Sequence, residues 1–123
     1  MWNLKALIKS LSHALRGVIL LLKTEQSFRL QLMVSGLVIF FCLFLPVTAF
    51  EVIVIFLLIA LVLVLEMINS IFERLVDTFK PRIHPVVGEI KDIMAAAVFV
   101  AAFFAALIGL IIFLPHFWRL FSY

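Results

Sequence analysis

The stretch LVLVLEMINSIFERLVD, residues 61–77, decides the fold because it joins an uninterrupted apolar run to a row of polar side chains. On an ideal helix, which turns about 100° per residue, five polar residues of this stretch fall on one face about 100° wide. They are Glu66, Asn69, Ser70, Glu73 and Asp77. Glu66 and Glu73 are two turns apart, roughly 10 Å along the axis. The stretch therefore predicts the end of a membrane-length helix with carboxylates and amides on one side.

The composition of the whole chain indicates an integral membrane protein. Of the 123 residues, 67% are hydrophobic, and the mean hydropathy is +1.32. Soluble domains are roughly half apolar, and a soluble core of this size could not hide so much apolar surface. We expect an all-α membrane protein, with an N-terminal amphipathic surface helix followed by three transmembrane helices.

The apolar runs divide the chain into one membrane-embedded domain over residues 1–123. The surface helix is expected over 3–23, and the spans over about 30–49, 50–77 and 92–115, each near the roughly 20 residues that cross a bilayer. Residues 3–23 have an apolar stripe and a basic reverse, which favours a helix in the membrane interface over one packed on a partner protein. The segment 79–89 contains two prolines and a glycine and is predicted to be a loop.

The distribution of positive charge predicts the orientation of the chain. The net charge is +3, but Lys and Arg occupy short segments between apolar runs, which excludes a nucleic-acid-binding face and favours lipid headgroups. Five precede the first span (Lys5, Lys9, Arg16, Lys23 and Arg29), and four separate the second and third spans (Arg74, Lys80, Arg82 and Lys91). The turn between the first two spans has none. The positive-inside rule then places the N-terminus in the cytoplasm.

Glu66 is the residue that the membrane setting leaves unexplained. Asp77 and Arg74 can be read simply as the wet end of a helix, but Glu66 directly follows the apolar run, where ionisable groups are costly and usually functional. A carboxylate in such surroundings is suited to accept a proton near neutral pH. Glu25 lies at the same predicted membrane level, at the junction before the first span. Lys91 and Asp92 lie there too, at the start of the third span.

Carboxylates from three segments at one level suggest a hard divalent cation. Single carboxylates suit Mg²⁺, which keeps waters and shares its shell with phosphates. A closed zinc site is excluded, because the three histidines are scattered and Cys42 has no second cysteine. Mg²⁺, basic residues and a deep carboxylate beside lipid make phosphoryl transfer to a membrane alcohol plausible. The four glycines form neither a P-loop nor a kinase glycine loop.

Four blocks between residues 11 and 114 carry a resemblance to a known family. They are ALRGVILLLKTEQSFR (14–29), LEMINSIFERLVD (65–77), IHPVVGEIKD (83–92) and AAAV (95–98). The second resembles the signature Glu-x-x-Asn-Ser/Thr-x-x-Glu-x-x-x-Asp of the small bacterial integral-membrane diacylglycerol kinases, which include undecaprenol kinases. The resemblance implies a homotrimer in the bacterial inner membrane, with active sites shared between subunits, ATP·Mg²⁺ as the phosphate donor and a membrane lipid as the acceptor.

The resemblance also implies roles for individual residues. Glu66 would be the catalytic general base, and Glu25 and Glu73 would bind both the metal and ATP. Asn69 would support the transferring phosphate. The nucleotide side would be lined by Asp77, Arg82, His84, Lys91 and Asp92. The lipid headgroup would lie near Phe28, Arg29 and Gln31, the last of which is acidic in some family members.

Several functions remain open on the residues alone. Diacylglycerol is the first candidate acceptor and undecaprenol the runner-up with the same mechanism, since the residues do not separate a glycerol hydroxyl from a polyprenol hydroxyl. A non-catalytic membrane subunit or a small cation transporter would use Glu66 to bind a cation or a proton. That alternative predicts polar groups near mid-bilayer in several spans, whereas only Ser35 lies at such depth in the first and third. An inactive relative is disfavoured because all three key carboxylates are present.

Overall fold

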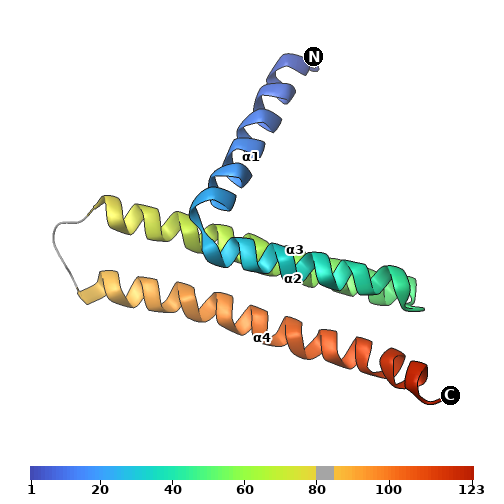
Figure 1. Cartoon of the computed structure of the whole chain (residues 1–123). Helices are drawn as coiled ribbons and strands as arrows, with labels where there is room; N and C mark the ends of the chain where they lie inside the picture. Colours follow the sequence, from blue (N-terminus) through green and yellow to red (C-terminus); the bar gives the residue numbers. More distant parts are fainter. Residues whose placement is uncertain (80–84) are drawn as a thin grey trace.

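The computed structural model describes residues 1–79 and 85–123, and within these ranges every regular element is an α-helix (Figure 1). The helices are α1 (Leu4–Thr24), α2 (Gln26–Phe44), α3 (Ala49–Thr78) and α4 (Pro85–Phe121). The last three are long and apolar enough to cross a membrane. The α3 helix runs antiparallel to α2, and α4 runs antiparallel to α3, whereas α1 projects away from all three at a steep angle (Figure 1). The predicted fold class is confirmed.

The first helix presents an apolar face that no other part of the described chain covers. Leu4, Leu7, Leu11 and Leu15 are each at least 60% exposed, and Leu21 is its single buried residue. Its other face carries the basic residues that the sequence places there. A helix of this kind, projecting from a bundle of membrane-length helices, suits the boundary between lipid and water.

A sharp bend at Glu25 separates α1 from α2. Glu25 has an extended backbone (φ −112°, ψ 110°), and its N–H donates to the carbonyl of Leu21 at 2.8 Å. The Arg29 guanidinium donates to the carbonyls of Leu22 at 2.8 Å and Lys23 at 3.3 Å. These bonds satisfy carbonyls that the end of α1 leaves free. The α2 helix therefore begins at residue 26, earlier than the span expected from residue 30.

The turn between α2 and α3 ends in a side-chain cap on the first turn of α3. Pro46 lies in the non-helical segment, and Thr48 caps α3. The Thr48 hydroxyl accepts from the Glu51 N–H at 3.2 Å, and the Glu51 carboxylate accepts from the Thr48 N–H at 2.8 Å. This reciprocal capping box fixes the first turn of α3. The helix then runs for 30 residues without a break.

The predicted loop over 79–89 is wrong for its second half, because α4 begins at Pro85. A proline is well tolerated in the first turn of a helix, since the N–H that it lacks would have no partner there. Gly88 and Glu89 are therefore helical. At its other end, α4 continues through Pro115 to Phe121. The helix axis is thus longer than the membrane span predicted over 92–115.

This antiparallel arrangement brings three helix ends to one side of the bundle. The start of α2, the end of α3 and the start of α4 lie at the end from which α1 departs (Figure 1). Few apolar side chains are buried within the protomer, and Phe28 and Ile55 are the most enclosed, each 2% exposed. Most of the bundle surface is therefore apolar, as expected where hydrocarbon is the solvent.

Candidate active site

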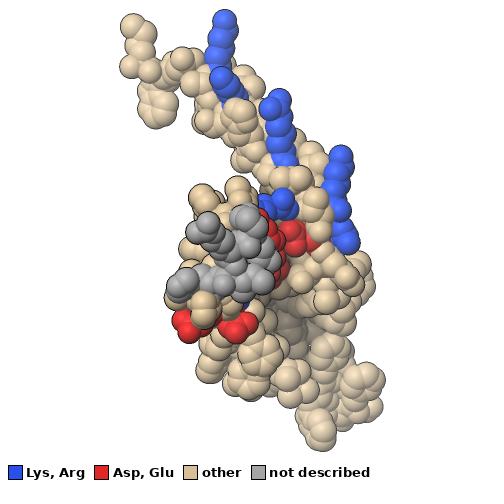
Figure 2. All heavy atoms as spheres, turned by 90° about the vertical axis from the view of Figure 1, so that its left-hand side faces the viewer, with Lys and Arg blue, Asp and Glu red and all other residues tan. Residues whose placement is uncertain are grey.

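The polar side chains of the bundle gather at the end from which α1 departs. Figure 2 looks onto that end: Lys and Arg follow the projecting helix, and acidic side chains lie at its base and on the bundle beneath. The acidic groups come from the α1–α2 junction, from the last turns of α3 and from the first turns of α4. The expected meeting of three segments at one level is present in the protomer.

Glu66 is buried at the inner edge of this cluster. Its side chain faces α2, where the Gln31 amide donates to a Glu66 carboxylate oxygen at 3.2 Å. The residue is 5% exposed. The carboxylates of Glu73 and Glu25 are near enough for their negative charges to repel a negative charge on Glu66. Glu66 therefore combines burial, a single side-chain hydrogen bond and two neighbouring carboxylates.

The next turn of α3 carries polar atoms whose hydrogen bonding is incomplete. The Asn69 amide donates to a Glu73 carboxylate oxygen at 3.3 Å. The Asn69 carbonyl oxygen, the Ser70 hydroxyl and the Gln31 carbonyl oxygen are buried without a hydrogen-bond partner among residues 1–79 and 85–123. Buried polar atoms are nearly always paired in native proteins. This group around Glu66 is therefore suited to receive polar atoms of a ligand or of a neighbouring subunit.

Glu25 connects the α1–α2 junction to α3. A Glu25 carboxylate oxygen lies 3.1 Å from the guanidinium of Arg74, which also donates to the Thr24 hydroxyl at 2.8 Å. From the sequence alone, Arg74 can be read as an ordinary charge at a wet helix end. In the structure it holds a predicted metal ligand, so a cation that binds Glu25 has to compete with this contact.

Asp77 and Lys91 connect α3 to α4. The Lys91 ammonium lies 2.8 Å from an Asp77 carboxylate oxygen, and the charge of Glu73 also acts on it. Asp92 follows as an exposed residue. The predicted nucleotide-side residues on α3 and α4 thus meet across the two helices. Arg82 and His84, predicted for the same role, lie outside the described residues.

The three residues predicted near the lipid headgroup have different positions. Phe28 is 2% exposed and is a core residue of the protomer. Arg29 closes the end of α1 through the carbonyls of that helix. Gln31 faces both Glu66 and an apolar groove between the helices. Among the three, Gln31 has the position that a lipid hydroxyl at Glu66 would approach.

The donor set fits Mg²⁺ only as part of a metal–nucleotide complex. Within residues 1–79 and 85–123, no three His, Cys, Asp or Glu side chains come close enough to hold a metal together. Glu25 and Glu73 nevertheless both interact electrostatically with Glu66. The buried side-chain carbonyl oxygen of Asn69 has no hydrogen-bond partner among the described residues and is available as an oxygen ligand. Mg²⁺ commonly takes one or two carboxylates and completes its shell with phosphate oxygens and water. These residues match that pattern.

A second polar contact, part-buried and not predicted from the sequence, lies at the opposite end of the bundle. The Glu51 carboxylate lies 3.1 Å from the Nε2 of His116, which is 7% exposed. Two sequence signals could have found it. Thr48 and Glu51 have capping-box spacing, and a histidine inside an apolar run is costly unless it is paired.

Comparisons with known proteins agree on one family. The chain matches the family described as prokaryotic diacylglycerol kinase over residues 12–113. It is 35% identical over 113 residues to the undecaprenol kinase of Bacillus subtilis, which covers 92% of each chain. It is 33% identical over 99 residues to the diacylglycerol kinase of Haemophilus influenzae, with 80% of this chain and 84% of that one covered.

Proposed function

The chain belongs to the prokaryotic diacylglycerol kinase family and is a lipid kinase, and we propose that it transfers the γ-phosphate of ATP to the hydroxyl of diacylglycerol. A membrane lipid is the acceptor, and a nucleotide is the phosphate donor. Family membership also favours an enzyme over the alternative of a non-catalytic subunit or cation transporter. The observation that carries the proposal is the burial of Glu66, with the charges of Glu25 and Glu73 nearby, about three turns before the end of the membrane-length helix α3.

Glu66 is the general base in this proposal. Its burial at the inner edge of the polar cluster supports this role, because a lipid hydroxyl would reach it from the hydrocarbon side. Accepting the hydroxyl proton leaves an oxygen nucleophile that attacks the γ-phosphorus, and ADP is the leaving group. The Gln31 amide, 3.2 Å from the carboxylate, holds Glu66 in place through this step. A positioned carboxylate of this kind typically contributes about 10²–10⁴-fold to the rate.

Glu25 and Glu73 hold the metal that accompanies the nucleotide. Mg²⁺ bound there supplies positive charge that screens the phosphate oxygens. Asn69 supports the transferring phosphate in this proposal, and the hydrogen bond that its amide donates to Glu73 at 3.3 Å supports a role next to the proposed metal ligand. The nucleotide side is formed by Asp77, Arg82, His84, Lys91 and Asp92.

The polar cluster also bears on how the protein assembles and how it is oriented in the membrane. We propose a homotrimer in the bacterial inner membrane, with the N-terminus and the polar cluster in the cytoplasm, where ATP is available. The unpaired buried atoms of Gln31, Asn69 and Ser70 support a site that is completed by substrate or by a neighbouring subunit. The basic residues of α1, on the same side as the cluster, support the cytoplasmic assignment (Figure 2).

Undecaprenol is the second candidate acceptor. The Bacillus subtilis relative that carries this name matches a longer part of the chain than the Haemophilus influenzae diacylglycerol kinase does. Both acceptors present one hydroxyl at the membrane surface, so the same Glu66 chemistry serves either. The two lipids differ in the group that bears the hydroxyl, a glycerol diester or the end of a polyprenol, and in their hydrocarbon chains.

A competition assay tests the proposal. The purified protein, in mixed micelles that contain equal amounts of diacylglycerol and undecaprenol, is supplied with Mg²⁺ and radiolabelled ATP, and both lipid products are quantified. We expect label chiefly in phosphatidic acid, with no transfer when Mg²⁺ is removed. Label chiefly in undecaprenyl phosphate would replace the acceptor and leave the mechanism intact. Transfer to neither lipid, or transfer without a divalent ion, would contradict the proposal.

A further inference from the structure

Four of the ten Lys and Arg residues of the chain form a straight row along α1. They are Lys5, Lys9, Arg16 and Lys23, and they are called the basic row. At about 100° per residue, their side chains fall within about 40° of one another around the helix axis. The first and the last are 18 residues apart, which corresponds to about 27 Å of helix. Figure 2 shows Lys and Arg side chains along one edge of the projecting helix.

The basic row has no acidic partner in the described part of the protomer. Residues 1–24 contain no Asp or Glu, so all seven acidic side chains of the chain lie in later segments. The four residues of the row are exposed, and none of them forms an ion pair with another residue of 1–79 or 85–123. Uncompensated positive charges in one line create a positive potential along that edge of the helix, which attracts negative charge.

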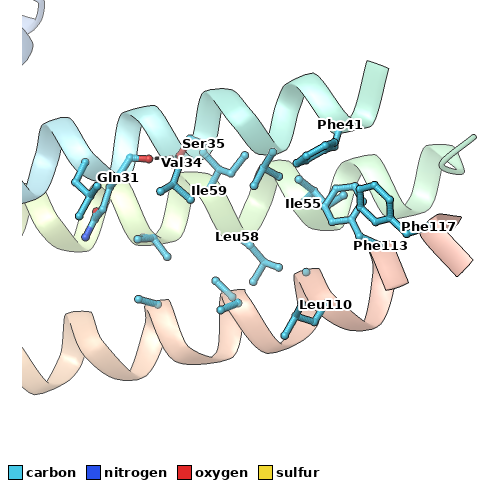
Figure 3. A pocket seen from close by; sticks show the side chains of 17 residues that line it. Gln31, Val34, Ser35, Phe41, Ile55, Leu58, Ile59, Leu110, Phe113 and Phe117 are labelled. Atoms are coloured by element: carbon cyan, nitrogen blue, oxygen red, sulfur yellow. Dashed lines mark hydrogen bonds between the residues drawn. The ribbon is translucent and has the colours of Figure 1, made fainter. Parts of the chain in front are cut away.

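The same helix presents hydrocarbon beside this charge. The exposed leucines of α1 are centred about 130° around the helix from the basic row; they are Leu4, Leu7, Leu11 and Leu15. The described residues that line the apolar groove of the bundle all belong to α2, α3 and α4 (Figure 3). A partner of α1 therefore has to offer hydrocarbon to the leucines and negative charge to the row. A leaflet that contains anionic phospholipids offers both, whereas a soluble acidic protein would leave the leucines in water.

The row lies at the border of the apolar face. Ile8 and Ile19 lie between the leucines and the row around the helix. Lys and Arg side chains at such a border extend their aliphatic stems along hydrocarbon and place their charged ends among the headgroups. The opposite flank, about 100° from the row, carries small uncharged residues instead: Ala6, Ser10, Gly17 and Thr24. The positive charge of α1 is therefore concentrated at headgroup level on one side.

The other end of α1 is tied to a proposed metal ligand. Leu21 is the single buried residue of the helix, and its carbonyl accepts from the Glu25 N–H at 2.8 Å. Arg74 donates both to the Thr24 hydroxyl at 2.8 Å and to the Glu25 carboxylate at 3.1 Å. The hydrogen bonds that join α1 to the described remainder of the chain are all at this end. Whatever holds the rest of α1 thus also sets the direction in which the chain enters Glu25.

We infer that the basic row binds the headgroups of anionic phospholipids in the cytoplasmic leaflet, and that this contact holds α1 in the orientation that positions Glu25. The second half of the inference rests on the proposed function and adds to it a dependence on the surface charge of the membrane. The acceptor lipid is uncharged, whereas a phosphate monoester carries roughly −1.5 to −2 charges at pH 7. The enzyme therefore also responds to the charge of its own product.

Two tryptophans allow the two ends of the molecule to be compared. Trp2 directly precedes α1, Trp118 lies near the end of α4, and both are exposed. Trp118→Phe leaves Trp2 as the only tryptophan, and Trp2→Phe leaves Trp118. Each protein is placed in nanodiscs of equal parts phosphatidylglycerol and phosphatidylcholine, in which one of the two lipids carries bromine atoms that quench tryptophan fluorescence. Because the composition is otherwise the same, unequal quenching reports local enrichment of one lipid.

We expect brominated phosphatidylglycerol to quench Trp2 as if it were enriched about fivefold, the equivalent of about 1 kcal/mol for one adjacent cation. Both lipids should quench Trp118 to a similar extent. Lys5→Gln together with Lys9→Gln should remove most of the difference at Trp2, and Lys5→Arg together with Lys9→Arg, which keeps the charge, should retain it. Equal quenching of Trp2 by the two lipids would overturn the inference in favour of an acidic protein surface, such as that of a second copy. The same preference at Trp118 would overturn it in favour of a general property of the bilayer.

Lipid phosphorylation in nanodiscs with a rising share of phosphatidylglycerol tests the link to Glu25. The rate of wild type should rise with this share, and the Lys5→Gln, Lys9→Gln variant should need an about fivefold larger share for half of its maximal rate. Arg119→Gln, which removes an exposed cation at the opposite end, should behave as wild type. Rates that do not depend on the share, despite enrichment at Trp2, would overturn the positioning of Glu25. Wild-type protein that phosphorylates no lipid at any share would instead disprove the proposed function, and the quenching measurement still decides the lipid contact.

Discussion

Two carboxylates on α3, the partly exposed Glu51 in its first turn and the buried Glu66 beside the polar cluster, have opposite surroundings. Glu51, in the first turn, accepts from the Thr48 backbone at 2.8 Å and pairs with His116 at 3.1 Å. Glu66, about four turns farther along, has one side-chain hydrogen bond, from Gln31, and two carboxylates as electrostatic neighbours. Both come from the same apolar helix. Glu51 thus caps the first turn of α3 and joins it to α4, whereas Glu66 keeps most of its hydrogen-bonding capacity free for a ligand.

The surroundings of each carboxylate explain this difference. Around Glu51 the hydrogen bonds join α3 to the preceding turn and to α4, which is the role of a structural contact. Around Glu66 the buried polar atoms of Gln31, Asn69 and Ser70 have no partner in the described part of the protomer. Unsatisfied buried groups are costly, so their retention beside a carboxylate indicates a site that binds something further.

The largest effect on turnover is expected when Glu66 is replaced by glutamine, with the same replacement at Glu51 as the comparison. Glu66→Gln keeps the shape of the side chain and removes the base, so turnover should fall by about 10²–10⁴-fold, with assembly and thermal stability preserved. Glu51→Gln is the matched control and should retain the turnover of wild type while it is folded. Lipid phosphorylation and size-exclusion chromatography measure both. Undiminished turnover of Glu66→Gln would reject its assignment as the base.

The next effect concerns the metal. Glu25→Gln and Glu73→Gln each remove one negative charge from the proposed Mg²⁺ ligands, so half-maximal activity should require about tenfold more Mg²⁺. Titration of activity with Mg²⁺ at saturating lipid measures this shift. Asp77→Asn, which affects the Lys91 contact instead, should leave the Mg²⁺ requirement close to that of wild type. Unchanged metal dependence in both Glu variants would count against their role.

A smaller effect is expected at the opposite end, on stability alone. His116→Phe removes the contact between α4 and Glu51, and should destabilise the bundle by about 1 kcal/mol, the usual contribution of one hydrogen bond. The midpoint of thermal inactivation in detergent should fall by a few degrees, with kcat unchanged below it. A large loss of kcat at low temperature would mean that this end also contributes to the reaction.

The smallest effect is expected at Arg74. Its contact with Glu25 joins two partly exposed side chains (44% and 24%), and such pairs contribute about 0–1 kcal/mol. Arg74→Met should therefore hardly change stability, and it should lower the Mg²⁺ concentration needed for activity, because the cation no longer competes with the guanidinium. A raised Mg²⁺ requirement would show that Arg74 assists nucleotide binding instead.

The sequence predicted the parts of this molecule that follow from local patterns. The four helices follow from apolar runs and amphipathic spacing, and the shared face of Glu66, Asn69 and Glu73 follows from helical periodicity. The start of α4 was misjudged, because Pro85 reads as a helix breaker although a proline also suits a first turn. This first turn of α4, residues 85–89, lies just before Lys91.

Contacts between different helices could not be predicted from such local patterns. The bond from Gln31 to Glu66 joins residues 35 positions apart, and the pair of Glu51 with His116 joins residues 65 apart. Each depends on the rotation and register of packed helices, which no local motif encodes. The groove between α2, α3 and α4 likewise exists only once three apolar surfaces are brought together.

The central claim, that metal and nucleotide bind at the Glu66 end, can be tested with a paramagnetic ion. Mn²⁺ replaces Mg²⁺ in a complex with ATP, and broadening of the backbone amide signals is measured by NMR in micelles. Glu51 and Glu73 are 22 residues apart on α3, about 33 Å, so the two ends are well resolved. The account predicts broadening around Glu25, Glu66 and Glu73 and none around Glu51 and His116. Broadening at the Glu51 end, or at neither end while the protein turns over, would contradict it.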